Sequence, residues 1–157
     1  MKYARLTKEQ FEEMHQEFIN FLATQSITAE EWKEIKASKP EIAEKELDIF
    51  SDLIWEGVLN KVEYLEHFSQ NQMFLFQITE NDMKLIAIKV LNEDIDITTR
   101  SGYTWLQKNL MDDLVDIYTS TKTIQEDRNK DIFALIQQGA NITKGDLYTY
   151  FEEVVQD

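Results

Sequence analysis

Cysteine is absent from this sequence of 157 residues, which has only one proline, four glycines and two histidines. Without cysteine the chain has no disulfide bond, no thiolate metal ligand and no cysteine nucleophile. The scarcity of proline and glycine argues against long flexible linkers. The four glycines are too scattered to form a phosphate-binding loop or a dinucleotide-binding fingerprint, and no serine lies in a Gly-x-Ser-x-Gly elbow.

Long apolar runs are also lacking. Runs such as Leu85–Ile88 and Ile132–Ile136 have at most five residues, far short of the roughly 20 residues that a membrane-spanning helix needs. The first eleven residues lack the apolar segment of a signal peptide. We therefore expect a cytoplasmic protein that does not associate with membranes.

Basic residues are fewer than acidic ones. The chain has 16 Lys and Arg and 30 Asp and Glu, which gives a net charge of −14. The excess is −7 in residues 1–66 and −7 in residues 67–157, so it belongs to the folded surface and not to a tail. Such a surface repels nucleic-acid phosphate and anionic lipid and attracts basic partners. We expect a protein partner of basic character and no direct nucleic-acid binding; alternatively, the charge only keeps the protein soluble.

Apolar residues make up 43% of the chain and aromatic residues 11%, enough for a core. Capping boxes at Thr7/Gln10 and Thr28/Glu31 predict helix starts. They indicate a first helix over residues 8–24 and a second that stops near Ser38. Pro40 suits the first turn of a third helix. Its expected buried face is Ala43, Leu47, Phe50, Leu53, Ile54 and Val58, and its expected solvent face is Glu41, Glu44, Asp48, Asp52 and Glu56.

After residue 60 the sequence becomes β-rich. Met73–Thr79 and Met83–Leu91 predict a hairpin, Val62–Phe68 a preceding strand, and the alternation in Glu93–Thr98 a half-exposed strand. Both faces of the hairpin carry apolar residues, so we expect both faces of the sheet to be covered. Helices could supply both covers, or a second subunit could supply one of them, which would make a homodimer through the sheet.

The last third is mainly helical by its pattern. Tyr103, Leu106 and Leu110 mark a short helix, and Leu114–Thr121 is ambiguous between helix and strand. Asp131–Gln138 predicts a helix that ends at Gly139, and Thr143 is expected to cap a final helix.

The predicted fold is therefore α+β, with N-terminal helices, a small, mainly antiparallel sheet of three to four strands, and C-terminal helices. Without a linker, we expect a single domain over residues 1–157. Its helical part covers about 1–60, its sheet about 61–99, and a mixed, mainly helical part about 100–157.

The two histidines are the only candidates for metal or acid–base chemistry. Glu12-x-x-His15 has the spacing found in di-metal helix bundles, but a second such motif is missing, since Glu63 lies four positions before His67. A core-edge histidine and a polar residue at a strand end are the simpler interpretations. We therefore assign no catalytic residue, no cofactor and no metal site, and keep Glu12, His15, Glu63 and His67 as the candidates to examine.

Three segments resemble a family of short, acidic bacterial proteins of unknown function: residues 5–11 (RLTKEQF), residues 48–59 (DIFSDLIWEGVL) and residues 136–140 (IQQGA). The resemblance extends over nearly the whole chain and implies no active site.

Together these patterns favour a non-catalytic module that binds a protein or regulates one through its acidic surface. The alternative is a small enzyme or metal-binding protein that uses His15 or His67 with neighbouring carboxylates, so the sequence leaves open whether the chain is an enzyme.

Overall fold

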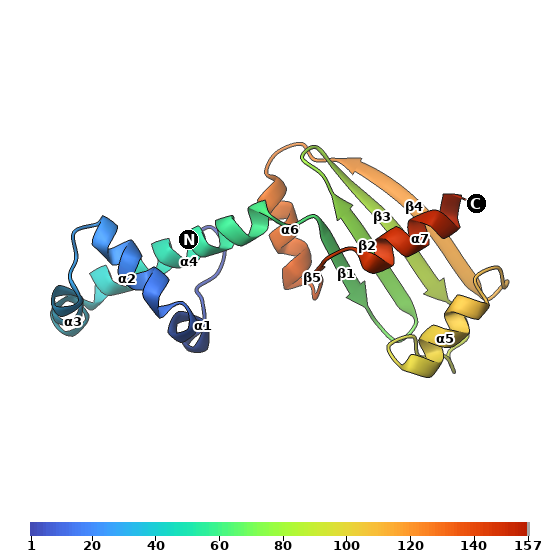
Figure 1. The fold of residues 1–157 in the computed structure, drawn as a ribbon, viewed down its shortest axis with the longest axis horizontal. Helices are drawn as coiled ribbons and strands as arrows, with labels where there is room; N and C mark the ends of the chain where they lie inside the picture. The colour runs from blue at the N-terminus through green and yellow to red at the C-terminus, as the bar shows by residue number, and fades with distance from the viewer. Residues whose placement is uncertain (157) are drawn as a thin grey trace. The chain divides into compact units, whose positions relative to one another are not determined.

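The computed structural model describes residues 1–156, and the chain forms two compact units, Met1–Asn60 and Lys61–Asp157 (Figure 1). The first unit is helical, and the second contains a five-stranded antiparallel sheet with its own helices. The predicted α+β class is thus confirmed. The unit boundary falls where the sequence changes from a helical to a β-rich pattern, while one domain over the whole chain stays a prediction.

The first unit consists of α1 (Lys8–Glu13), α2 (His15–Thr24), α3 (Ala29–Ser38) and α4 (Pro40–Asn60). The first capping box forms as predicted, because the Thr7 hydroxyl accepts from the Gln10 amide and the Gln10 side chain accepts from the Thr7 amide. At α3 the Thr28 hydroxyl accepts from the Glu31 amide at 3.1 Å and donates to the Glu31 carboxylate, so Thr28 caps the helix with the first half of the predicted box. Local hydrogen-bonding rules therefore fix where α1 and α3 begin.

The predicted continuous helix over residues 8–24 is wrong, because Met14 interrupts it with a non-helical ψ of 26°. The break accompanies packing of rings from both sides of it onto one partner. The Phe11 ring lies 5.9 Å and the Phe18 ring 5.0 Å from that of Phe50. Tertiary packing thus overrides the local helical pattern.

The predicted buried face of α4 is correct at four of its six positions. Ala43 and Phe50 are buried, and Leu47 and Ile54 are half-buried against the core, but Leu53 and Val58 are 55% and 42% exposed. The buried residues of the second half include Ser51 and Leu59 instead. These α4 residues complete or flank the core of the first unit, whose buried members are Leu6, Phe18, Leu22, Trp32, Ala43 and Phe50.

The sheet of the second unit has the strand order β4-β3-β2-β1-β5, and every neighbouring pair is antiparallel. Its strands are β1 (Tyr64–Phe68), β2 (Gln72–Ile78), β3 (Asp82–Val90), β4 (Val115–Thr123) and β5 (Asn141–Thr143). The hairpin of β2 and β3 and the preceding strand are confirmed. The expected three to four strands become five because the ambiguous segment forms β4 and a short β5 pairs with β1.

Two local predictions in this unit are wrong. Residues 93–98 form turns and not a strand, because side chains cap their own backbone: Asn92 accepts from the Asp94 amide and Asp96 from the Thr98 amide, each at 2.9 Å. Thr143 does not cap the last helix. It ends β5, and its hydroxyl accepts from the Gly145 amide at 3.2 Å.

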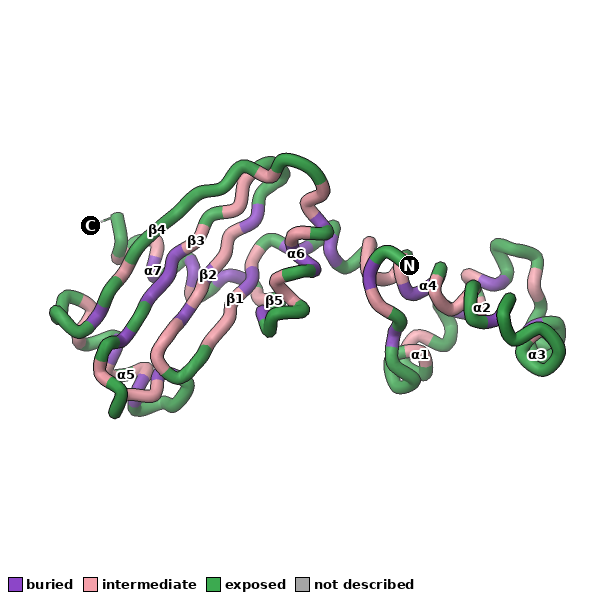
Figure 2. Tube along the Cα trace, turned by 180° about the vertical axis from the view of Figure 1, so that it is seen from behind, coloured by how far each residue is buried: buried purple, intermediate pink, exposed green. Residues whose placement is uncertain are grey.

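One face of the sheet is covered by α5 (Arg100–Lys108) and α7 (Asp146–Gln156), seen in front of the strands in Figure 1. Below them lies the main core of this unit, which includes Met73, Leu75, Ile86, Ile88, Leu106 and Phe151. Figure 2 shows the buried residues concentrated on β2 and β3, whereas β4 is mostly exposed. This asymmetry follows from the edge position of β4 in the sheet.

The opposite face carries the other half of the hairpin residues. Phe74, Phe76 and Leu85 are half-buried there, and Tyr118 of β4 is 54% exposed. The chain that follows α6 (Arg128–Gln137) reaches this face, since a Cβ at Gly139 would lie 3.0 Å from the His67 ring. This is the face on which the homodimer predicted from the sequence would form.

Among residues 1–156, the helices are all too short or too polar to cross a bilayer.

Gly102 fixes how closely α5 approaches the turn before it. A Cβ at this buried position would lie 1.7 Å from the Asp96 carbonyl oxygen, a backbone atom that cannot move alone. We therefore expect Gly102→Ala to lower the free energy of unfolding by about 1–3 kcal/mol, the usual cost of overpacking. Chemical denaturation measures this, with Gly57→Ala as the control. Gly57 has no atom within 4 Å of its Cβ position, and alanine there should raise stability by up to about 1 kcal/mol.

Glu66 lies beneath α7, and burial followed by repulsion from Asp146 raises the pKa of its carboxyl group. The folded state therefore holds this proton more tightly than the unfolded chain, and stability is lost as pH rises from the unfolded pKa through the folded one. Glu66→Gln should raise the melting temperature at pH 7, and the gain should shrink towards pH 4. Thermal unfolding from pH 4 to 8 measures this, with the exposed Glu63→Gln as the control. A gain that does not depend on pH would contradict the assignment.

Candidate functional site

An apolar groove lies within the first unit and has a volume of about 690 Å³. It is bounded by the N-terminal segment, α1, α2 and α3, and it reaches Leu47 of α4. Its apolar lining is Leu6, Phe11, Phe18, Ile19, Leu22, Ala29, Trp32 and Leu47. A groove of this volume falls in the range of small-molecule sites, about 300–1,000 Å³.

Aromatic rings form the floor of the groove. Phe18 is central, because its ring packs edge-on against Trp32 at 5.2 Å and against Phe50 at 5.0 Å. Phe11 adds a third edge-on contact to Phe18 at 5.8 Å. Such edge-to-face pairs are favourable beyond their buried area, so the floor is held by contacts within the unit and does not depend on a ligand.

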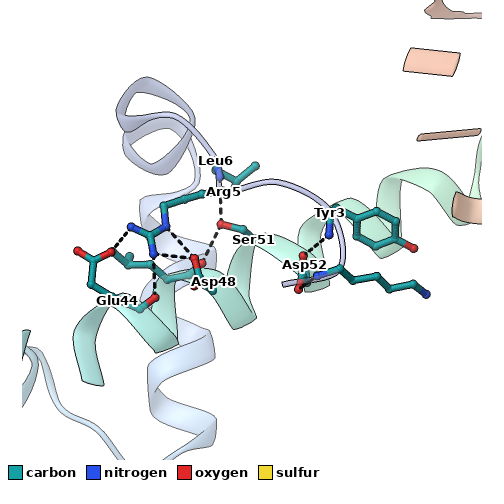
Figure 3. Close-up of polar contacts among 9 residues, drawn as sticks. Tyr3, Arg5, Leu6, Glu44, Asp48, Ser51 and Asp52 are labelled. Atoms are coloured by element: carbon teal, nitrogen blue, oxygen red, sulfur yellow. Dashed lines mark hydrogen bonds and ion pairs between the residues drawn. The ribbon is translucent and has the colours of Figure 1, made fainter. Parts of the chain in front are cut away.

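Arg5 and Leu6 form one wall, and they belong to residues 2–6, which we call the N-terminal strap. The strap runs along α4 and binds four acidic residues spaced four apart, which we call the acidic ladder: Glu44, Asp48, Asp52 and Glu56. Figure 3 shows the first three of them beside the strap. A four-residue spacing places side chains on one side of a helix. The sequence predicted these four residues as a solvent face, so their role in holding the strap was missed.

The contacts of the strap with the ladder are both main-chain and side-chain. Asp52 accepts from the backbone amides of Lys2 and Tyr3 at 2.8 and 2.9 Å. The Arg5 guanidinium donates to Asp48 through Nε at 2.8 Å and also contacts the carboxylate of Glu44. Charge-assisted hydrogen bonds of this kind are stronger than neutral ones.

These contacts change the proton affinity of two strap residues. Hydrogen bonds to Asp48 and then to Glu44 raise the pKa of the Arg5 guanidinium, which keeps it charged. Burial, followed by the hydrogen bond to Glu56, raises the pKa of the Tyr3 hydroxyl. Both residues therefore hold their protons and remain donors to the ladder.

Ser51 ties the strap to the core beside the groove. Its hydroxyl is fully buried, accepts from the Leu6 amide at 3.0 Å and donates to the Leu47 carbonyl at 2.7 Å. Leu6 and Leu47 both line the groove. One hydroxyl therefore positions two lining residues from different segments.

Charged residues line the groove as well. Four are basic, and they are Arg5, Lys8, Lys33 and Lys36; the one acidic lining residue is Glu12. Arg5 is neutralised by the ladder, whereas within residues 1–156 no ion pair forms at Lys8, Lys33 or Lys36. The Lys36 ammonium lies 6.0 Å from the centre of the Trp32 ring. The rim is thus cationic on a chain that is acidic as a whole.

Two of the sequence candidates, Glu12 and His15, line this groove, and both are exposed. They lie in different helices, because the break at Met14 separates α1 from α2. Within residues 1–156, no group of three or more His, Asp or Glu residues is placed to hold a metal ion. Glu12 and His15 therefore have no third metal ligand beside them among the described side chains.

The other two candidates, Glu63 and His67, lie in the second unit. His67 is half-buried, and its ring is 6.3 Å from that of Phe74 on the face opposite α7. Its neighbour Glu66 points to the other face, since successive side chains alternate along a strand. A direct Glu66–His67 acid–base pair is therefore not formed.

We expect Ser51→Ala to loosen the strap. The substitution leaves the buried Leu6 amide without its acceptor, which costs about 1–3 kcal/mol, offset by about 0.5 kcal/mol of better helix propensity. The unfolding free energy should fall, and the Leu6 amide should exchange its hydrogen faster, as NMR would show. Ser38→Ala in α3 is the control, because that exposed hydroxyl only donates to the Glu34 carbonyl. Unchanged exchange at Leu6 would contradict the role of Ser51.

Comparison with known protein families matches residues 1–156 to DUF6495, a family of unknown function. Neither a curated protein nor a solved structure matches the chain significantly.

Proposed function

This chain belongs to DUF6495, a family of unknown function, and we propose that it is a non-catalytic binding module whose N-terminal unit takes an apolar ligand into the groove. The observation that carries the proposal is the groove itself, with about 690 Å³ of space over an aromatic floor. Half of its 14 lining residues are Phe, Trp, Leu or Ile, whose side chains make apolar contacts and are chemically unreactive.

The way the groove is built supports binding by a preformed site. Its floor is held by ring contacts around Phe18, and its strap wall is held by the acidic ladder. A site that is ordered before the ligand arrives loses less conformational entropy on binding. A module of this kind fits the regulatory role predicted from the sequence, because a bound ligand would change the surface that a partner meets.

The test uses the full chain and the neutral apolar dye Nile red, whose emission shifts to the blue in an apolar site. We expect saturable binding by the wild-type protein. Ala29→Trp would fill the groove, because Ala29 lines it at the start of α3, and should weaken the affinity at least about tenfold, which corresponds to about 1.4 kcal/mol.

The matched control is Ala37→Trp, which adds the same ring to an exposed position of the same helix outside the groove lining. It should leave the affinity unchanged. Circular dichroism verifies that both variants fold. The proposal is overturned if the wild type shows no saturable binding, or if the two variants behave alike.

A further inference from the structure

We infer that the ligand of the groove is a single-chain amphiphilic anion, with its tail on the aromatic floor and its negative headgroup between Lys33 and Lys36. This inference rests on the proposed function and adds the chemical class of the ligand. It starts from the contrast between the rim of the groove and the rest of the chain.

Cations are concentrated at the groove. The lining includes four of the 16 Lys and Arg residues of the chain but only one of its 30 acids. If the groove lining only kept this acidic protein soluble, we would expect it to contain more acidic than basic residues, as the whole chain does. Local positive charge next to an apolar surface is what recognition of an amphiphilic anion requires, since the tail is removed from water while the headgroup keeps a counter-charge.

One of the four cations, Arg5, is already engaged by acids of the first unit, and a second, Lys8, has an acid beside it in the groove lining. Arg5 is held by Glu44 and Asp48 of the acidic ladder. Among the described residues Lys8 forms no ion pair, but Glu12 lies one helical turn away in α1 and lines the groove with it, so its carboxylate offsets the charge of Lys8 there. The acids of α3 do not line the groove beside Lys33 and Lys36, and we therefore assign the anion to these two lysines.

The neighbours of Lys33 and Lys36 on α3 support this assignment. The two lysines lie three residues apart on α3, which brings their like charges together, while Glu30 lies three residues before Lys33 and outside the groove lining. Lys36 lies in the last turn of α3, where a cation interacts favourably with the helix dipole, but that explanation does not extend to Lys33. An anion bound between both ammonium groups would remove the repulsion.

The size of the groove favours a small amphiphile over a protein segment. Its volume of about 690 Å³ suits a ligand of drug size. A stable protein interface buries about 800 Å² on each partner and involves about 20–30 residues a side, whereas 14 residues line this groove. We therefore commit to a single acyl-type chain with one anionic headgroup.

The experiment measures displacement of Nile red by three amphiphiles with the same twelve-carbon tail, all below their micelle concentrations. The amphiphiles are dodecanoate, dodecanol and dodecyltrimethylammonium. We expect dodecanoate to bind the full chain at least about tenfold more tightly than the cation, with the alcohol in between. Equal affinities for all three would overturn the inference while leaving the proposed apolar binding intact.

A charge-reversal pair sharpens the test. Lys33→Glu combined with Lys36→Glu should weaken dodecanoate binding at least about tenfold more than dodecanol binding, and should narrow or invert the preference for dodecanoate over the cation. Lys39→Glu combined with Lys45→Glu is the matched control, since it makes the same change in net charge at exposed positions outside the lining.

The outcomes separate the two proposals. Loss of dodecanoate preference only in the first double variant supports the inference, and equal loss in both variants shows a general charge effect and overturns it. If the wild-type protein fails to bind Nile red at all, the proposed function itself fails. Should the first double variant not fold, as judged by circular dichroism, Lys33→Gln with Lys36→Gln replaces it and should lose the preference without inverting it.

Discussion

The hold of α4 on the N-terminal strap is the interaction on which the first unit depends. Asp52 binds two backbone amides, Asp48 and Glu44 bind Arg5, and the buried Ser51 hydroxyl binds the Leu6 amide. Isolated exposed ion pairs contribute little, but here they act together with main-chain contacts along one side of a helix. The strap in turn supplies Leu6 and Arg5 to the groove, so the shape of the site is set by acids that do not line it.

This arrangement changes the meaning of the acidity. From the sequence, the net charge of −14 suggested a surface for a basic partner. In the first unit, part of the negative charge is used inside the protein to hold the strap, and the cations gather where the apolar lining is open to a ligand. Net charge describes how the whole molecule behaves in solution, whereas the arrangement of individual charges determines which ligand a groove accepts.

The sequence predicted correctly those helix starts and turns that depend on residues close together along the chain. The caps at Thr7 and Thr28, the start of α4 at Pro40 and the β2–β3 hairpin all follow from local hydrogen bonding and alternation. The break at Met14 and the five-residue extent of the strap do not, because they depend on packing against Phe50 and α4 from distant positions. The same holds for the candidate site. Glu12 and His15 were found by spacing, but the lysines of α3 gained significance only when folding placed them beside Trp32.

The topology of the sheet has a consequence for the order in which the second unit forms. β1, β2 and β3 follow one another along the chain and are joined by short loops, whereas residues 69–140 separate β5 from its partner β1. Closing a longer loop loses more conformational entropy before the new strand contacts can offset that loss. The meander of β1–β3 therefore has the smaller barrier and serves as the template to which β5 adds. Because α7 directly follows β5, the last segment to join the sheet also brings the helix that seals its core.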